Sequence, residues 1–250
     1  MNRIAGVWLL LTVAAYPQDA RQIVQEAQNR SRSPSQHYEG LLKVIDSKGK
    51  ITEKRWSYDR LGSHGNSKAV LRFTAPAEVK GVALLIVNHP DRSSDQWMWI
   101  PDIGRERRVA FQDRSTRFFG TDFTFEDLEE RDVSQYDFKL LNEEPMDGAE
   151  CWKVESKPRQ GKSSQYTHSY VWIRKDNYAF ARIESYKGEK PVRNLQYGDI
   201  RQVQGIWTAH KLDMHDLGRK SHTIMTMDKL QYNVKLSESD FTLQALRRSS

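Results

Sequence analysis

Residues 166–200 read YTHSYVWIRKDNYAFARIESYKGEKPVRNLQYGDI, and the residue pattern of this stretch decides the fold class. It contains three runs rich in β-branched and aromatic residues: 166–174, 179–186 and 192–200. Polar turn residues separate the runs, Lys175-Asp176-Asn177 after the first and Lys187-Gly188 after the second. Turns of this kind between strand runs are typical of hairpins. The stretch therefore predicts consecutive antiparallel strands and no βαβ units.

The same pattern continues on both sides of this stretch. Ten further strands are expected at 38–45, 50–58, 68–74, 81–87, 95–100, 106–111, 136–142, 150–156, 206–214 and 223–234. Residues 46–49 and 146–148 supply two more hairpin turns, and residues 20–30 form an amphipathic helix that Asp19 can cap. About a dozen strands favour a sheet that curls toward a barrel or half-barrel. Neither a repeat nor a linker divides the chain, so one domain is expected over residues 16–250.

The first residues are typical of an export signal. Arg3 is followed by a largely apolar run to Ala15, and small residues precede a cleavage point that we place after Ala15. This run is too short to span a bilayer core of ~30 Å. We therefore expect residues 1–15 to be a signal peptide and the mature protein to be soluble in the bacterial periplasm. Cys151, the single cysteine, is expected to be a buried and inert thiol.

Composition supports a globular core and a basic surface. Hydrophobic residues make up 38% of the chain and aromatic residues 10%, and the formal net charge is +6. This charge would favour anionic lipid surfaces or acidic partners, but its even spread along the chain favours simple solubility as the explanation. Nothing in the composition indicates disorder.

Two blocks in the middle of the chain combine aromatic and charged residues. The first, WMWIPDIGRERRV at 97–109, is expected to be a hairpin with an aromatic arm and a basic arm. The second, RFFGTDFTFEDL at 117–128, places four Phe residues within eight positions. Gly120 allows a sharp turn there, and Thr121 or Asp122 can cap a short helix that carries Phe125 and Leu128 on one face. Because burying a Phe contributes ~1.5–3 kcal/mol, either protein or ligand is expected to cover this segment.

In their order and spacing, these two blocks resemble the outer-membrane lipoprotein-sorting protein family, relatives of the lipoprotein carrier LolA. The preceding Lys80-Gly81-Val82-Ala83-Leu84-Leu85 and the closing Asp240-Phe241-Thr242 are also similar to family segments. Val82 departs mildly, since a small hydroxyl residue is expected there. The resemblance implies a mainly β fold, a curved antiparallel sheet forming an incomplete, half-open β-barrel around a hydrophobic cavity, with a few helices closing the open side. It further implies a carrier that shields acyl chains of a lipid or lipoprotein, and a partner of the RND-type inner-membrane transporter class.

The resemblance also suggests which residues line the cavity. The aromatic candidates for lipid binding are Trp97, Trp99, Phe118, Phe119, Phe123, Phe125 and Trp172. Ordinary core packing remains the alternative for each of them. The candidates for a structural or partner contact are Arg105, Arg107, Arg108, Gly120, Asp122 and Asp127. We favour arginine pairing with Asp122, Glu126 or Asp127 over contact with lipid phosphate or an acidic partner.

No catalytic, cofactor or metal site is expected. The seven histidines lack metal-ligand spacing, and Ser63-His64 lies in a polar loop without a nucleophile elbow. The acidic run Glu126, Asp127, Glu129 and Glu130 is expected to be a solvated face. Two alternatives stay open. One is a periplasmic sensor or adaptor of the same fold, and the other is a nucleic-acid binder, which export disfavours. We expect a monomer that does not bind nucleic acid.

Overall fold

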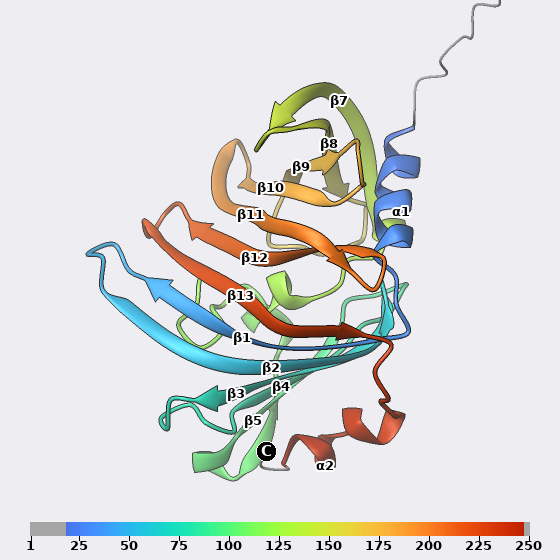
Figure 1. The fold of residues 1–250 in the computed structure, drawn as a ribbon. Helices are drawn as coiled ribbons and strands as arrows, with labels where there is room; N and C mark the ends of the chain where they lie inside the picture. The colour runs from blue at the N-terminus through green and yellow to red at the C-terminus, as the bar shows by residue number, and fades with distance from the viewer. Residues whose placement is uncertain (1–18, 248–250) are drawn as a thin grey trace, which may run out of the picture.

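The structure, a computed structural model, describes residues 19–247. Its strands all belong to one antiparallel sheet, shown in Figure 1. They are β1 (Ser35–Ile45), β2 (Ile51–Ser63), β3 (Asn66–Ala75), β4 (Ala83–Val87), β5 (Asp95–Ile100), β6 (Arg105–Arg108), β7 (Tyr136–Met146), β8 (Ala149–Pro158), β9 (His168–Arg174), β10 (Phe180–Lys187), β11 (Lys190–Val203), β12 (Ile206–Asp216) and β13 (Ser221–Tyr232). Each of the thirteen expected strands is present, and the expected hairpin turns join them.

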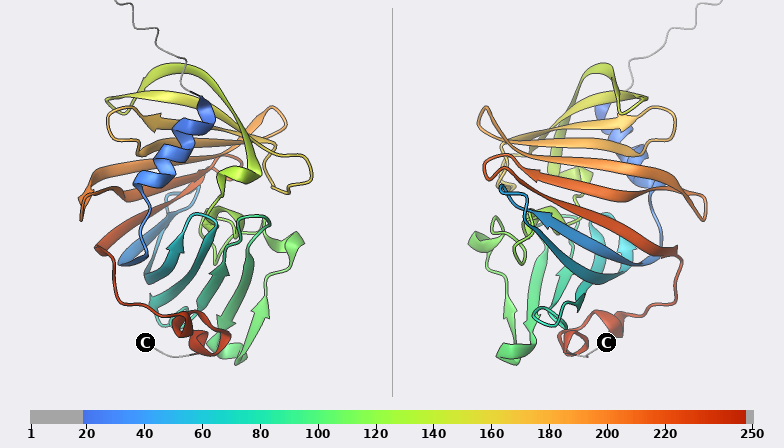
Figure 2. Two further views of the ribbon diagram at one scale, coloured as in Figure 1. Left: turned by 90° about the vertical axis from the view of Figure 1, so that its right-hand side faces the viewer. Right: turned by 60° about the vertical axis from the view of Figure 1, so that its left-hand side comes forward.

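The order of the strands places the first and last strands side by side in the middle of the sheet. The order is β6-β5-β4-β3-β2-β1-β13-β12-β11-β10-β9-β8-β7, so β1 pairs with β13 at the centre, while β6 and β7 are the edges. The sheet curves strongly, but its edges do not pair with each other (Figure 2). The predicted fold class, an incomplete antiparallel β-barrel, is confirmed.

One helix covers part of the concave face. The helix α1 (Ala20–Arg30) begins where expected, because the Asp19 carboxylate accepts a hydrogen bond from the Arg21 N–H at 3.1 Å. Its apolar stripe, which includes Ile23 and Val24, packs on inner-face residues of β8 and β9, among them Val154 and Ile173. Figure 2 shows α1 lying along this half of the sheet. The period of its apolar residues thus sets which side of the helix closes the barrel.

The long connection from β6 to β7, residues 109–135, runs through the concave side and is called here the crossing segment. It contains three 3₁₀ turns, η2 (Phe111–Asp113), η3 (Glu126–Leu128) and η4 (Val133–Gln135), whereas η1 (Pro101–Ile103) lies between β5 and β6. Its aromatic residues join the main core with inner-face residues of β1 to β4 and of β12 and β13. The crossing segment therefore fills one half of the barrel with the protein's own side chains.

The C-terminal residues pack on the opposite, convex face. There η5 (Glu238–Phe241) and α2 (Leu243–Leu246) bury Phe241 and Leu246 against Val70 and Leu85. The Arg72 guanidinium donates to the Leu246 carbonyl at 3.0 Å. Of the two α-helices within residues 19–247, only α1 covers the open side.

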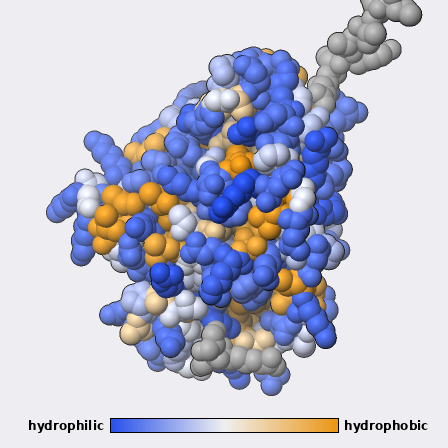
Figure 3. All heavy atoms as spheres, in the orientation of Figure 1, coloured by the Kyte–Doolittle hydropathy of each residue, from blue (hydrophilic) through white to orange (hydrophobic). Residues whose placement is uncertain are grey.

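The surface is mainly polar. Figure 3 shows hydrophilic residues over most of one face, with an apolar patch near the tips of β1, β2 and β13. Ile51 and Leu217, which lie in hairpins at these tips, are exposed. No helix among the described residues is both long and apolar enough to cross a membrane. The expected signal peptide lies outside the described residues.

Candidate functional site

A cavity of about 190 Å³ lies between α1, the crossing segment and the inner faces of β7 to β12. Most of its wall is apolar: Val24, Val133, Phe138, Val171, Phe180, Ile183, Leu195 and Met214 line it. Two small residues, Ser156 on β8 and Ser185 on β10, also face the cavity and leave room there. The cavity is thus a gap in the packing between the helix and the sheet.

Hydrogen bonds from α1 to the crossing segment hold this cavity closed on one side. Gln28 Nε2 donates to the Arg131 carbonyl at 2.7 Å. Arg21 donates to the Val133 carbonyl at 3.0 Å and to the Tyr136 carbonyl at 2.7 Å. The same residues 131–136 form part of the cavity wall. The helix and the crossing segment are therefore fastened to each other at the edge of the cavity.

A second cavity of about 180 Å³ shares Phe180 and Tyr197 with the first. Ala27, Trp207, Leu212 and Met227 are among its other walls. Ligand pockets usually measure ~300–1,000 Å³, so each cavity alone is small for a lipid. Phe180 and Tyr197 line both spaces, so the two cavities are neighbours.

The acidic residues at the cavity are already bonded. Asp127 accepts from the Tyr166 hydroxyl at 2.7 Å and from the Thr124 N–H and hydroxyl, each at 2.8 Å. Glu129 binds the Arg114 guanidinium through both carboxylate oxygens and accepts from Gln96 Nε2 at 2.8 Å. Burial raises the pKa of Glu129, although Arg114 opposes that shift. These carboxylates therefore fix the crossing segment in place.

The predicted solvated face of Glu126, Asp127, Glu129 and Glu130 is wrong. The carboxylates of Glu126 and Glu130 also point to partners, since Glu126 accepts from the Gln165 N–H at 2.9 Å and Glu130 pairs with Arg60 at 3.3 Å. The expected short helix after Gly120 is wrong as well, because only the 3₁₀ turn η3 forms and no side chain caps it. The acidic residues connect the crossing segment to β2, to β5 and to the residues just before β9.

The four Phe residues of the second block lie in the main core and outside both cavities. Phe118, Phe123 and Phe125 are buried, and Phe119 is partly buried. Phe118 stacks on Phe73 of β3 with ring centroids 5.4 Å apart. Gly120 (φ 76°) and Phe119 (φ 44°) form a tight turn, since the Thr121 N–H donates to the Phe118 carbonyl at 2.9 Å. The structure thus places this block in the packed half of the barrel.

The three Trp candidates face the convex side. Trp97 and Trp99 pack with the cluster beneath α2, and the residue between them, Met98, packs against the inner core instead. Trp172 is buried beside Cys151 and donates to Glu144 Oε1 at 2.6 Å, whereas its neighbour Val171 lines the cavity. Side chains alternate between the two faces of a strand, so the aromatic positions fall on the side away from the cavity.

The basic arm of the first block does not pair with the second block as predicted. Arg108 binds Asp95 Oδ1 at 2.6 Å, Arg107 lies 3.5 Å from Asp113, and Arg105 is exposed. Asp122 is fully buried and accepts hydrogen bonds from Arg117, Ser221 and Thr223. It therefore connects the crossing segment to β13. Among the predicted contact residues, Asp127 alone lines the first cavity.

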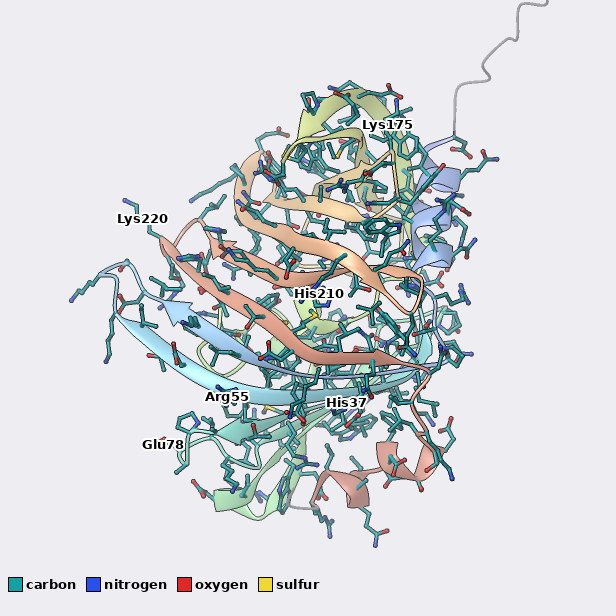
Figure 4. All side chains as sticks on the ribbon, in the orientation of Figure 1. His37, Arg55, Glu78, Lys175, His210 and Lys220 are labelled. Carbon is teal, nitrogen blue, oxygen red and sulfur yellow. The ribbon has the colours of Figure 1, made fainter. Side chains whose placement is uncertain are left out.

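Five of the histidines lie on internal strands, His37 on β1, His168 on β9, His210 and His215 on β12 and His222 on β13. His210, which Figure 4 shows near the middle of β12, is buried, and its Nδ1 lies 3.1 Å from the Thr208 carbonyl. Asp213, His215 and His222 bring their ligand atoms within 4.8 Å of one another, a group that the sequence spacing did not reveal. Cross-strand pairing of His215 with His222 creates it. Both rings contact Asp213 Oδ1, at 3.2 Å and 2.8 Å, so the group is satisfied without an ion.

The sequence alone did not identify the residues that line the cavity. Arg131, Phe180, Ile183 and Tyr197 lie at the first cavity, and none of them belongs to a motif block. The available signal was the alternation on β9 to β11, which groups Val171 with Ile183 and Leu195 once the strand register is known.

Comparison with solved structures identifies the same architecture in proteins from three bacteria. A protein domain from Vibrio parahaemolyticus, described as an outer membrane lipoprotein-sorting domain, matches with a TM-score of 0.87 and 24% identity. The match covers 92% of this chain and 98% of that one. A DUF1329 family protein from Desulfovibrio piger matches with a TM-score of 0.86 and 25% identity, covering 91% and 97%. A LolA superfamily protein from Nitrosomonas europaea matches with a TM-score of 0.70 and 17% identity, covering 90% and 98%.

Sequence comparison gives a consistent result. The search of the curated proteins finds no match. A family model described as an uncharacterized protein matches residues 65–248, which is more than half of the chain. The chain therefore belongs to the family that this model describes, and it shares its fold with the DUF1329 family protein and with the lipoprotein-sorting and LolA superfamily proteins.

Proposed function

We propose that the protein is a periplasmic carrier that binds the acyl chain of a lipid or lipoprotein in the cavity beneath α1 and passes it toward the outer membrane. The observation that supports this most directly is the apolar cavity between α1 and β7 to β12, in a fold shared with lipoprotein-sorting proteins. Each CH₂ group shielded from water contributes about 0.8 kcal/mol, so an apolar cavity is what an acyl chain needs to cross an aqueous compartment.

In this function, the acyl chain occupies both cavities. A chain entering the first space reaches the second where Phe180 and Tyr197 line both. These aromatic rings close the passage when no ligand is bound, which keeps the apolar surface covered. Binding and handover then need no covalent step. An RND-type inner-membrane transporter as the donor rests only on resemblance to the lipoprotein-sorting family.

The test is to fill the first cavity from one strand position and to change the next position as a control. Val171→Phe adds volume inside the cavity, whereas Trp172→Phe alters the opposite face of β9. We expect Val171→Phe to abolish binding of radiolabelled 1-hexadecanol in equilibrium dialysis, with Trp172→Phe close to wild type. Native mass spectrometry of wild-type protein from its own periplasm should show a lipid adduct.

Two results would contradict the proposal. If the folded wild-type protein binds no acyl probe and carries no adduct, cargo binding fails. If Val171→Phe binds as wild type does, the cavity beneath α1 is not the binding site.

A further inference from the structure

Arg131 stands apart from the other charged residues of the cavity. Its side chain lies at the first cavity and is partly buried. The guanidinium carbon lies 5.7 Å from the ring centres of both Tyr136 and Tyr166. Its backbone is held by Gln28, which donates to the Arg131 carbonyl at 2.7 Å. The helix and two aromatic rings therefore fix where this cation lies.

Within residues 19–247, the Arg131 guanidinium forms neither a hydrogen bond nor an ion pair with the protein. By contrast, Asp127, Glu129 and Arg193 at the same cavity each have a bonded partner. Burial acts to lower the pKa of Arg131, but the nearby Tyr136, Glu126 and Asp127 outweigh it and leave the pKa raised. Arg131 therefore stays charged, with its N–H donors unused.

A partly buried guanidinium without a hydrogen-bonded partner is costly, because charges removed from water are normally paired and hydrogen-bonded. Arginine cannot lose its proton to relieve the cost, and its planar fork matches a carboxylate or phosphate. Aromatic faces compensate only part of the lost hydration. The arrangement suits a site completed by an anion.

Two further donors face the same space. Arg193 Nε is buried and has no partner among the described residues, while its Nη1 pairs with Asp216. The Tyr197 hydroxyl likewise forms no hydrogen bond with that part of the chain, and burial raises the pKa of Tyr197 to about 12, so it remains a donor. The carboxylates of Asp127 and Glu129 are occupied by neutral donors and Arg114, and Asp132, which also lines the cavity, accepts from the Ser134 N–H.

We propose that the two cavities together bind a single-tailed amphiphile with an anionic head, whose carboxylate or phosphate is bound by Arg131 at the first cavity and whose acyl chain lies along Val171, Ile183 and Leu195 toward the second. This rests on the proposed carrier function and narrows its cargo. The uncharged acyl-glycerol group of a lipoprotein offers no anion to Arg131. The cargo is therefore a free anionic lipid.

The experiment compares head groups on one 16-carbon tail. Binding of hexadecanoate, hexadecyl phosphate, 1-hexadecanol and hexadecylamine is measured by equilibrium dialysis below their micellar concentrations. The proteins are wild type, Arg131→Gln and Arg108→Gln. Arg108 is the matched control, because its guanidinium also stacks on an aromatic ring, Trp97, but on the convex face.

We expect wild type and Arg108→Gln to bind hexadecanoate and hexadecyl phosphate roughly tenfold or more tightly than 1-hexadecanol, as charge-assisted hydrogen bonds predict. Arg131→Gln should lose this preference and keep its affinity for 1-hexadecanol, which shows that the cavity remains intact. Inorganic phosphate alone, the head group without a tail, should not displace hexadecanoate at equal concentration.

Several outcomes overturn the inference, and they are distinguishable from failure of the carrier function. Equal binding of acid and alcohol, a preference that persists in Arg131→Gln, or tighter binding of hexadecylamine removes the anion site but leaves the carrier function. Displacement by equimolar phosphate shows an anion site without an acyl-chain role. If none of the four tailed probes binds, the carrier function fails together with this inference.

Discussion

Adjacent residues on one strand of this protein face different environments, and this decides the role of each. On β9, Val171 lines the cavity, and Trp172 is buried on the other face. On β5, Met98 faces the inner core, and Trp97 and Trp99 face α2. Size and aromatic character therefore do not identify a cavity residue in a β-barrel. The face of the sheet does, and a single sequence does not specify it for strands that are apolar on both sides.

At Cys151 the same alternation predicts an unreactive thiol. The side chain is fully buried, and burial raises its pKa to about 11, so very little thiolate exists at pH 8. We expect its reaction with Ellman's reagent to be at least a hundredfold slower in native protein than in urea-unfolded protein. Cys151→Ser/Ser115→Cys is the control, because Ser115 is exposed and its thiol should react at once. Rapid native labelling of Cys151 would contradict its burial.

Asp122 is the residue whose loss should cost most stability. Its carboxylate is fully buried and accepts from Arg117 at 2.9 Å, Ser221 at 2.6 Å and Thr223 at 2.8 Å. Asp122→Ala removes the ion-pair partner of Arg117, which keeps only its bonds to the Gly120 and Thr121 carbonyls, and removing one member of a buried pair costs about 3–5 kcal/mol. Urea unfolding should show this loss, whereas Asp102→Ala, at an exposed position, should change little. A loss below about 1 kcal/mol would show that the network is not holding the crossing segment.

At the scale of elements, the β5–β6 hairpin depends on Asp95. Hydrogen bonds from Arg92 hold the pKa of Asp95 well below its usual range, with further bonds from Arg108 and His89. A lowered pKa means that the contribution to stability is complete above the unfolded value of ~3.9 and is lost as the pH falls below it.

We therefore expect the free energy of unfolding of wild type to decrease between about pH 4 and pH 2, and Asp95→Asn to show a smaller decrease. Urea titrations at stepped pH measure this slope. Asp102→Asn serves as the control and should keep the wild-type slope. Identical slopes in wild type and Asp95→Asn would mean that other carboxylates dominate acid unfolding.

The helix α1 and the crossing segment form the second element-level unit. Arg21 and Gln28 bond the carbonyls of residues 131, 133 and 136. Arg21→Met/Gln28→Leu removes these bonds but keeps the apolar stripe of the helix. Hydrogen exchange of residues 131–136 should increase at least tenfold, and Gln22→Ala, on the exposed face, should leave it unchanged. Unchanged exchange in the double variant would show that apolar packing alone holds the segment.

The positions of the helix and the strands were predicted best. The spacing of apolar residues, the turn residues and the Asp19 cap located α1 and all thirteen strands, because these signals are local. The crossing segment was not predictable in the same way. Its acidic residues looked solvent-facing, yet they are bonded by Arg60, Gln96 and Tyr166, which lie in other segments of the chain. Such partners become known only when the sheet brings them together.

At the scale of the whole molecule, the open sheet leaves two edge strands that other chains could pair with. The edge β6 consists of Arg105, Glu106, Arg107 and Arg108, and the edge β7 contains Pro145 with several charged residues. Charge and proline at sheet edges prevent pairing with another chain. The protein is therefore expected to be a monomer.

Removing the positive charge from β6 should allow this edge to pair with another chain. Arg105→Val/Arg107→Val should convert the monomer to dimers or larger aggregates, measured by light scattering after size-exclusion chromatography. The control Arg201→Val/Lys211→Val makes equivalent changes at exposed positions on the internal strands β11 and β12 and should stay monomeric. Aggregation of both variants to the same extent would assign the effect to lost surface charge in general.

The pairing of β1 with β13 also constrains how the chain is made. A ribosome releases β1 early and β13 among the last strands, so the two halves of the sheet cannot join until nearly the entire polypeptide is available. Until then, the growing chain exposes the unpaired edge of β1 and the apolar side chains of its inner face. A chaperone that keeps such a chain unfolded until β13 is available would prevent misassembly. The protein can function only after β1 and β13 have paired.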